Sequence, residues 1–529
     1  MLPDLYFGVE RCAARHFTRV FRSYGAGVTV LAAVGLITPT AQAAPDCAAM
    51  AAVALPDVRI TSAAVVAAAA PVPEYCRVRG MLEKTIEFEV ALPTTKWNGK
   101  LFFAGGGGFN GSMPNLNQGL ARGYAAAGSD TGHKGVNSLD ARWALNDTQA
   151  QINYGHRATH LVTALSKQLL KTYYGQAQKR AYFVGCSNGG KMGLTEVQRY
   201  PDDFDGVVVG NPVIDRTKLM LSYTLNARAL APAPIPPSKL PLIEKATLAA
   251  CDARDGLADG VIDSPHQCKV DLRPLVCKSG DAADCLTEGQ LKAVEQLWAG
   301  PRDAAGGRFY PGYVPGHEAD WGAFITGDGK RDARPSSTWG FQDGFLRYFV
   351  FGPEFDGVRD FDLRQHMSVV ERFAADQDAA RTDLSAFQAR GGKLLMYHGW
   401  ADHSITPLRT IEYYGGVRAQ HGAATDDFVR LFMVPGLHHC TKGPGPNSFG
   451  GSNQGYAPAD DAEHDIVRAL DLWVEGGAAP QKLIATKFVD DDPKKGVART
   501  RPLCPYPQIA RYRGNGDVNS AASFACVQP

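Results

Sequence analysis

One pentapeptide of this sequence could present an activated nucleophile. Gly185-Cys186-Ser187-Asn188-Gly189 matches G-x-S-x-G and lies between an apolar run at 181–184 and a stretch of helical periodicity at 188–199. A strand before and a helix after are the context in which this motif forms a sharp turn that exposes the serine hydroxyl. The alternative is an exposed serine in a glycine-rich turn. We interpret Ser187 as the candidate nucleophile of an acyl-transfer reaction.

Candidate partners for this serine follow two later apolar runs. Asp402 comes after the run 393–397, and His438 and His439 come after the run 428–434. A serine hydroxyl needs a general base, and the base needs an acid that orients it. The order serine, acid, histidine, each after a strand, is typical of the α/β-hydrolase fold. Asp402 could instead be a turn cap, and the pattern alone does not choose between the two histidines.

An oxyanion hole would need two backbone N–H groups beside the nucleophile. Asn188, directly after Ser187, would supply one of them. The glycine run at 105–108 directly follows the short apolar segment 100–104 and would supply the other, for which we favour Gly107. Glycine lets the backbone approach a substrate oxygen closely. A flexible linker is the alternative reading of such a run.

The elements that must position these residues alternate between strand and helix patterns. Ile86–Leu92 alternates apolar and polar residues, and 207–209 is a buried type of strand. Residues 152–174 and 461–476 have helical periodicity. This alternation predicts a mostly parallel sheet covered on both faces. The length of 529 residues predicts an additional large insertion.

The character of the chain changes between residues 214 and 388, where Pro and Gly are frequent, four cysteines cluster and apolar periods are irregular. We predict an α/β-hydrolase catalytic domain formed by 44–213 and 389–529, with 214–388 inserted as a lid domain. Such a split fits the length of the chain.

The N-terminal residues 1–43 read as a signal peptide. Four arginines precede an uncharged apolar stretch, and Ala41-Gln42-Ala43 offers a small-x-small cleavage pattern. The apolar stretch is short for a membrane span, although an uncleaved anchor is the alternative. We therefore expect an exported protein without stable membrane association. The net charge of +1 indicates neither a nucleic-acid partner nor a polybasic membrane surface.

Ten of the 11 cysteines lie after the predicted signal peptide. An even number in an exported chain predicts disulfides. No CxxC pair occurs, which argues against a zinc or redox site. The spacing alone does not fix the pairing.

Two of these cysteines adjoin the candidate catalytic residues. Cys186 directly precedes Ser187, and Cys440 directly follows His439. With the distant Asp402, this arrangement resembles the tannase and feruloyl esterase family from about Cys47 to Cys526. The resemblance implies a Cys186–Cys440 disulfide, and it selects His439 as the base. It also implies four pairings between sequence neighbours: Cys47–Cys76, Cys251–Cys268, Cys277–Cys285 and Cys504–Cys526.

The resemblance further implies a structural calcium site in the lid. The matching segment is Cys251-Asp252-Ala253-Arg254-Asp255-Gly256-Leu257-Ala258-Asp259-Gly260-Val261-Ile262-Asp263. Its implied ligands are carboxylates of Asp252, Asp255 and Asp259 and backbone carbonyls of Leu257 and Val261. Oxygen ligands from a tight loop suit Ca²⁺, although Asp and Gly also form ordinary turns. No organic cofactor is expected.

Members of this family hydrolyse esters of aromatic acids, including gallates, hydroxycinnamates and mono(2-hydroxyethyl) terephthalate. The resemblance therefore implies a small aromatic ester as substrate, with an acyltransferase or a non-catalytic binding protein as alternatives. We find no match to the arginine that holds the free carboxylate in the terephthalate enzyme. His398 and Ile405 flank Asp402 and are candidate pocket residues. Candidate lid aromatics are Trp321, Trp339, Phe341, Phe345 and Tyr348.

Overall fold

The computed structural model describes residues 46–529, and the predicted signal peptide lies outside this range. No helix within the described residues is both long enough and apolar enough to cross a membrane.

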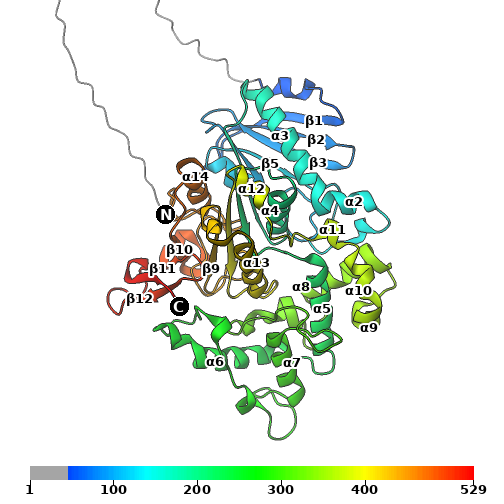
Figure 1. Cartoon of the computed structure of the whole chain (residues 1–529), viewed down its shortest axis with the longest axis vertical. Coiled ribbons are helices and arrows are strands. Elements are labelled where there is room, and N and C mark those ends of the chain that lie inside the picture. The colour runs from blue at the N-terminus through cyan, green and yellow to red at the C-terminus, as the bar shows by residue number, and fades with distance from the viewer. Residues whose placement is uncertain (1–45) are drawn as a thin grey trace, which may run out of the picture. The chain divides into compact units, whose positions relative to one another are not determined.

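A nine-stranded sheet forms the centre of the molecule, with the strand order β1-β2-β3-β5-β4-β6-β7-β8-β9 (Figure 1). The pairs β1–β2, β2–β3 and β3–β5 are antiparallel, and the other five pairs are parallel. This mostly parallel sheet confirms the predicted α/β class. Its strands are β1 Val58–Val66, β2 Tyr75–Leu82, β3 Ile86–Pro93, β4 Lys100–Ala104, β5 Ala125–Ser129, β6 Arg180–Cys186, β7 Gly206–Gly210, β8 Lys393–Gly399 and β9 Val429–Val434.

Helices cover both faces of this sheet. Side chains alternate across each strand, so Phe103 of β4 faces the core beneath α3, α4 and α13, whereas Phe102 faces the core beneath α1 and α14. The buried strands are apolar on both sides for this reason. The covering helices are α1 Asn117–Ala121, α2 Thr148–Ile152, α3 Ala158–Tyr174, α4 Asn188–Arg199, α13 Pro407–His421 and α14 Ile466–Gly476.

Two of the predicted helices have different bounds in the structure. The segment predicted at 152–174 is divided, because a π-helical turn at Asn153–Arg157 separates α2 from α3. The helix predicted from 461 begins at Ile466 instead. Asp465 caps this helix, since its carboxylate accepts hydrogen bonds from the N–H groups of Val467 and Arg468.

The segment between β7 and β8 contributes no strand to the sheet. Its helices α6 and α7, coloured green, lie below the sheet in Figure 1, whereas α12 packs against α4. Part of it has a core of its own, in which Leu240, Val294 and Trp321 are buried. The assignment of 214–388 as a separate lid domain stays a prediction. The helices of this segment are α5 Arg216–Leu230, α6 Leu240–Cys251, α7 Glu288–Ala299, α8 Ser337–Gly344, α9 Gly357–Asp360, α10 Leu363–Glu371, α11 Ala374–Gln377 and α12 Ser385–Ala389.

Two small antiparallel sheets complete the C-terminal part of the chain. The first pairs β10, Leu483–Phe488, with β11, Val497–Leu503. The second pairs β12, Ile509–Tyr512, with β13, Phe524–Val527.

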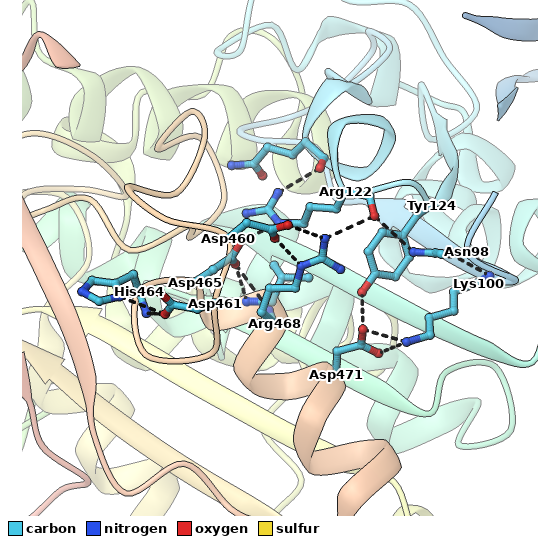
Figure 2. A network of polar contacts seen from close by, with 12 residues as sticks. Asn98, Lys100, Arg122, Tyr124, Asp460, Asp461, His464, Asp465, Arg468 and Asp471 are labelled. Atoms are coloured by element: carbon cyan, nitrogen blue, oxygen red, sulfur yellow. Dashed lines mark hydrogen bonds and ion pairs between the residues drawn. The ribbon is translucent and has the colours of Figure 1, made fainter. Parts of the chain in front are cut away.

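A polar network fixes α14 against β4 and the segment after α1 (Figure 2). Lys100 Nζ of β4 lies 2.7 Å from both carboxylate oxygens of Asp471, and Tyr124 donates to the same carboxylate at 3.0 Å. Arg122 Nε donates to Asp465 at 2.6 Å, and both side chains are buried. Because β4 leads into the glycine run, these contacts hold the strand that positions the predicted oxyanion loop.

Candidate active site

Ser187 occupies a strained turn between β6 and α4. Its φ of 62° and ψ of −122° lie outside the regions that non-glycine residues usually adopt. A Cβ on Gly185 would lie 2.5 Å from the Gly189 carbonyl, so only glycine fits there. The predicted strand–turn–helix context is therefore present, and such strain is characteristic of functional sites.

The parallel strands bring the three candidate catalytic segments to one edge of the sheet. Gly210 of β7 pairs with both Cys186 of β6 and Tyr397 of β8, and β8 pairs with β9 along its length. The carboxyl ends of these strands therefore lie together. Ser187, Asp402 and His439 all follow such ends, which is where ligands bind in open α/β sheets.

Asp402 is fully buried and surrounded by hydrogen-bond donors. Its Oδ1 accepts from the N–H groups of Ser404 and Ile405 at 2.7 and 3.0 Å. Its Oδ2 accepts from Asn211 Nδ2 at 2.6 Å and lies 3.2 Å from His398 Nε2. Burial alone would raise the pKa of Asp402, but interactions with His439 and His398 hold it well below its usual range. Asp402 is therefore a carboxylate in the folded protein.

His439 is the histidine that pairs with this carboxylate. Its Nδ1 lies 2.9 Å from Asp402 Oδ2. A carboxylate can only accept, so Nδ1 carries the proton and Nε2 is left free to accept one. His438 instead places Nε2 3.2 Å from Asp320 Oδ2 in the inserted segment. The two neighbouring histidines, which the sequence pattern alone did not distinguish, thus have different carboxylate partners in the structure.

A disulfide joins the nucleophile segment to the histidine segment. Cys186 and Cys440 are bonded, and their Cα atoms lie 6.0 Å apart. Ser187 and His439 are the adjacent residues, so the bond fixes the two loops beside each other. Within residues 46–529 the His439 ring is hydrogen-bonded to Asp402 and not to Ser187 Oγ. Hydrogen bonds between a nucleophile and its base are often long without substrate and tighten in the substrate complex.

The other four disulfides also match the pairing that the resemblance implied: Cys47–Cys76, Cys251–Cys268, Cys277–Cys285 and Cys504–Cys526.

The two segments predicted to form the oxyanion hole lie in close contact. A Cβ on Gly189 would come within 3.1 Å of the Gly106 carbonyl oxygen, so the start of α4 and the glycine run meet without side chains between them. Asn188 is buried, whereas Gly107 is exposed. A Cβ atom added to Gly107 would have no other atom within 4 Å. Gly107 and Asn188 remain the predicted donors.

Arg216, at the start of α5, was not singled out from the sequence. Its side chain is only 2% exposed, and its Nη2 donates to Asn188 Oδ1. Its guanidinium carbon lies 4.9 Å from the ring centre of Tyr154 and 5.7 Å from that of Phe109. A buried arginine thus holds the residue after the nucleophile. No local pattern in the sequence distinguishes it from other arginines.

The structure places both predicted pocket residues in packed surroundings. His398 is fully buried, and its nitrogens lie 2.8 Å from Thr410 Oγ1 and 3.0 Å from the Ile405 carbonyl. His398 therefore packs against Asp402 and does not line an open pocket. Ile405 is 2% exposed and packs in the core that includes Phe345. The other predicted lid aromatics are buried or half-buried in the cores of the inserted segment.

A polar cavity of about 370 Å³ borders the glycine run. The sequence did not predict it, because its lining comes from segments far apart in the chain. Its polar side chains are Asn110, Ser112, Asn115, Gln118, Ser452 and Asn453.

The predicted calcium loop is closed by the Cys251–Cys268 disulfide. Asp252 accepts from the N–H groups of Asp259 and Gly260, and Asp255 accepts from that of Leu257. Burial, together with the neighbouring carboxylates of Asp259 and Asp252, raises the pKa of Asp255 to about 6. Asp259 Oδ2 lies 3.0 Å from Arg499 and 2.7 Å from Arg501. The loop thus holds three carboxylates of like charge, one of which two arginines already compensate. The calcium site stays a prediction.

Three comparisons with known proteins show what the chain is similar to. The family model "Tannase and feruloyl esterase" matches residues 70–527. An uncharacterized esterase of Xanthomonas campestris is 36% identical, over 94% of each chain. The mono(2-hydroxyethyl) terephthalate hydrolase of Piscinibacter sakaiensis is 32% identical, over 88% of this chain and 86% of its own. The crystal structure of feruloyl esterase B from Aspergillus oryzae superimposes with a TM-score of 0.82 at 26% identity, covering 91% of this chain and 99% of its own.

Proposed function

Since the chain belongs to the tannase and feruloyl esterase family and is a carboxylic ester hydrolase of that type, we propose that it hydrolyses esters of aromatic acids through an acyl-enzyme on Ser187. One observation carries the mechanistic part of this proposal. The Cys186–Cys440 disulfide ties the strained Ser187 turn to His439, whose Nδ1 lies 2.9 Å from the buried Asp402.

In the first half of the proposed reaction, Ser187 Oγ attacks the ester carbonyl carbon while His439 Nε2 takes the hydroxyl proton. The N–H groups of Asn188 and Gly107 would stabilise the resulting oxyanion. Collapse of the tetrahedral intermediate breaks the bond to the alcohol, which leaves with the proton from His439. In the second half a water molecule repeats these steps and releases the acid and the free serine.

Asp402 and Arg216 act as positioning residues in this scheme. Asp402 holds His439 in the tautomer whose Nε2 accepts a proton, and its charge stabilises the imidazolium that forms. Arg216 bonds to the Asn188 side chain, so it fixes the peptide unit that would donate to the oxyanion. Both residues are buried and already hydrogen-bonded to the groups that they position.

The aromatic acyl preference rests on the family and not on any single contact. Feruloyl and galloyl esters are the proposed substrates. A terephthalate monoester is the alternative, because the Piscinibacter sakaiensis relative is named for hydrolysing one. Transfer of the acyl group to an added alcohol would use the same site and would yield ester instead of acid.

A product assay tests this proposal directly. The mature protein is incubated with methyl gallate, methyl ferulate, a terephthalate monoester and short-chain p-nitrophenyl esters. We expect turnover of an aromatic-acid ester, and labelling by a fluorophosphonate probe that Ser187→Ala abolishes. Replacement of the exposed Ser279 by Ala is the matched control. It should leave both the ester turnover and the fluorophosphonate labelling unchanged. Turnover of the aliphatic acyl esters alone would refute the substrate class, whereas labelling of Ser187→Ala would refute the nucleophile.

We also propose export to an oxidising compartment. The five disulfides favour this location, because such bonds are rare in reducing compartments.

We further propose that the 252–263 loop binds a structural Ca²⁺. Carboxylates of Asp252, Asp255 and Asp259 and carbonyls of Leu257 and Val261 would hold it. The support is the donor set, which is oxygen only and mostly anionic. Calcium at 100 times its Kd would stabilise the fold by about 2.7 kcal/mol, so chelation should lower the Tm and added Ca²⁺ should restore it.

The variant Asp255→Asn should weaken this calcium response, whereas Asp284→Asn, in an exposed loop outside the site, should leave it intact. An unchanged melting curve after chelation, together with no calcium in the purified protein, would contradict the assignment.

A further inference from the structure

A second group of possible metal ligands lies at the far end of the nucleophile helix. His160 is in the first turn of α3, Glu196 is in the last turn of α4, and Asp203 is in the turn between α4 and β7. One ligand atom from each side chain lies within 4.8 Å of the other two. Within residues 46–529 this is the one trio of such side chains that meets so closely.

Glu196 is the unusual member of this group. It is 1% exposed, and neither of its carboxylate oxygens has a hydrogen-bond partner. A buried carboxylate without a partner is costly, so such groups are normally bonded to a donor or a cation. Both oxygens of Glu196 are therefore available to a cation bound between it and the other two side chains.

The other two side chains are held ready by neighbouring residues. His160 Nδ1 lies 2.6 Å from Asp203 Oδ2, and the His160 ring stacks on Tyr200 with the ring centres 4.0 Å apart. Lys167 Nζ donates to the Asp203 backbone carbonyl at 2.6 Å but lies 4.0 Å from its carboxylate.

We propose that His160, Glu196 and Asp203 bind a divalent transition-metal ion, with Zn²⁺ as the best match. An imidazole nitrogen combined with carboxylate oxygens suits Zn²⁺, whereas Ca²⁺ and Mg²⁺ prefer oxygen ligands alone. The His160 side chain is 35% exposed, so solvent can reach the site and water can complete the coordination.

Only a small movement is needed to admit the ion. Metal–ligand distances of about 2.0–2.1 Å in a tetrahedral arrangement place two ligand atoms about 3.3 Å apart. The His160 Nδ1 to Asp203 Oδ2 distance would therefore open from 2.6 Å by less than 1 Å. His160 would turn from hydrogen bonding with Asp203 to donating its Nδ1 lone pair to the metal.

The location indicates a structural role. The three ligands come from α3, α4 and the turn into β7, so a bound ion would join these three segments. Because α4 begins directly after Ser187, the ion would stabilise the helix that supports the nucleophile from its opposite end. This site and the 252–263 loop share no residue, so their metal responses can be separated.

Zinc titration of the full mature, untagged protein tests the proposal. The protein is treated with chelator, reloaded with Ca²⁺ and titrated with Zn²⁺ by calorimetry, and its Tm is followed in parallel. We expect one Zn²⁺ per chain bound with a raised Tm. Glu196→Gln and His160→Asn should each weaken binding by at least about 10-fold, as the loss of a ligand requires. Co²⁺ should give a visible absorption band that both variants lose.

The matched control is His464→Asn. His464 Nδ1 lies 2.9 Å from the carboxylate of Asp461 (Figure 2), but among residues 46–529 no third ligand joins this pair. The control should bind Zn²⁺ as the unsubstituted chain does. Zinc binding that persists in Glu196→Gln, or the absence of stoichiometric binding in the unsubstituted chain, would overturn the proposal. His160→Asn alters a half-exposed residue, so it remains informative if Glu196→Gln does not fold.

Discussion

Two buried carboxyl groups of this molecule differ in their charge. Asp402 follows β8 at the candidate active site, and Glu318 lies in the inserted segment; both are 0% exposed. Four donors or more surround Asp402, including Asn211 and two backbone N–H groups. Glu318 accepts one backbone hydrogen bond, from Gly316 at 3.0 Å, and its Oε2 has no partner. Asp402 and Glu318 are therefore equally buried, but Asp402 accepts more hydrogen bonds than Glu318 does.

The pKa values of the two groups move in opposite directions. Burial penalises the charged form in both cases. For Glu318 burial raises the pKa to about 7, because the N–H groups around it, that of Gly316 first, lower the pKa only in part. For Asp402 the interactions with His439 and His398 outweigh burial, and the pKa lies well below its usual range. The comparison shows that charged and hydrogen-bonding neighbours, and not burial by itself, decide the direction in which the pKa of an interior carboxyl group moves.

The largest expected effect comes from removing the charge of Asp402. Asp402→Asn should lower kcat by about 10⁴-fold, because the imidazole loses the acceptor that sets its tautomer. The unfolding free energy should fall by only about 1–3 kcal/mol, the cost of buried donors left unpaired. Ester turnover and denaturant unfolding measure the two quantities. A kcat within tenfold of the unsubstituted enzyme would remove Asp402 from the mechanism.

Glu318→Gln should act on stability alone, and mainly at high pH. Between an unfolded pKa of about 4.3 and a folded pKa of about 7, the folded chain keeps a proton that the unfolded chain releases. Stability from this group therefore falls as the pH rises through that window, by about 4 kcal/mol in all. Glutamine has no proton to lose, so the variant should not show this fall. The unfolding free energy of the variant minus that of the parent should therefore be larger at pH 8 than at pH 4.5.

Denaturant unfolding at the two pH values measures this difference. The exposed Glu354→Gln is the control and should show no such difference. A constant offset of Glu318→Gln from the parent at both pH values would mean that Glu318 is charged in the folded protein.

The smallest expected effect comes from removing one donor of Asp402. Asn211→Gly deletes the Nδ2 group that lies 2.6 Å from Oδ2, and glycine tolerates the φ of 39° at this position. A hydrogen bond to a charged group contributes about 1.5–3 kcal/mol, so stability should fall by that order. Because Asp402 keeps its other donors, kcat should fall by about tenfold or less. A loss as large as that of Asp402→Asn would show that Asn211 alone keeps Asp402 charged.

Several central elements of the sheet were predictable from the sequence, whereas the interior strand β5 was not. The strand at Lys100–Ala104 and the helix at Asn188–Arg199 have the predicted bounds, because apolar runs and glycine boundaries mark them clearly. Strand β5, Ala125–Ser129, was missed, since alanine and glycine carry little strand preference. It is a strand because it lies between β3 and β4 and is buried on both faces.

The sequence by itself determined the α/β class, the order Ser187, Asp402 and His439 after strand ends, and the cysteines beside two of them. These features are local: each depends on residue types within a few positions of one another. Only the tertiary structure placed Asn211 and His398 around Asp402, Arg216 on Asn188, and His160 beside Glu196 and Asp203. Donor and acceptor in such contacts can be separated by nearly 200 residues, and the packing of strands and helices decides which of them meet.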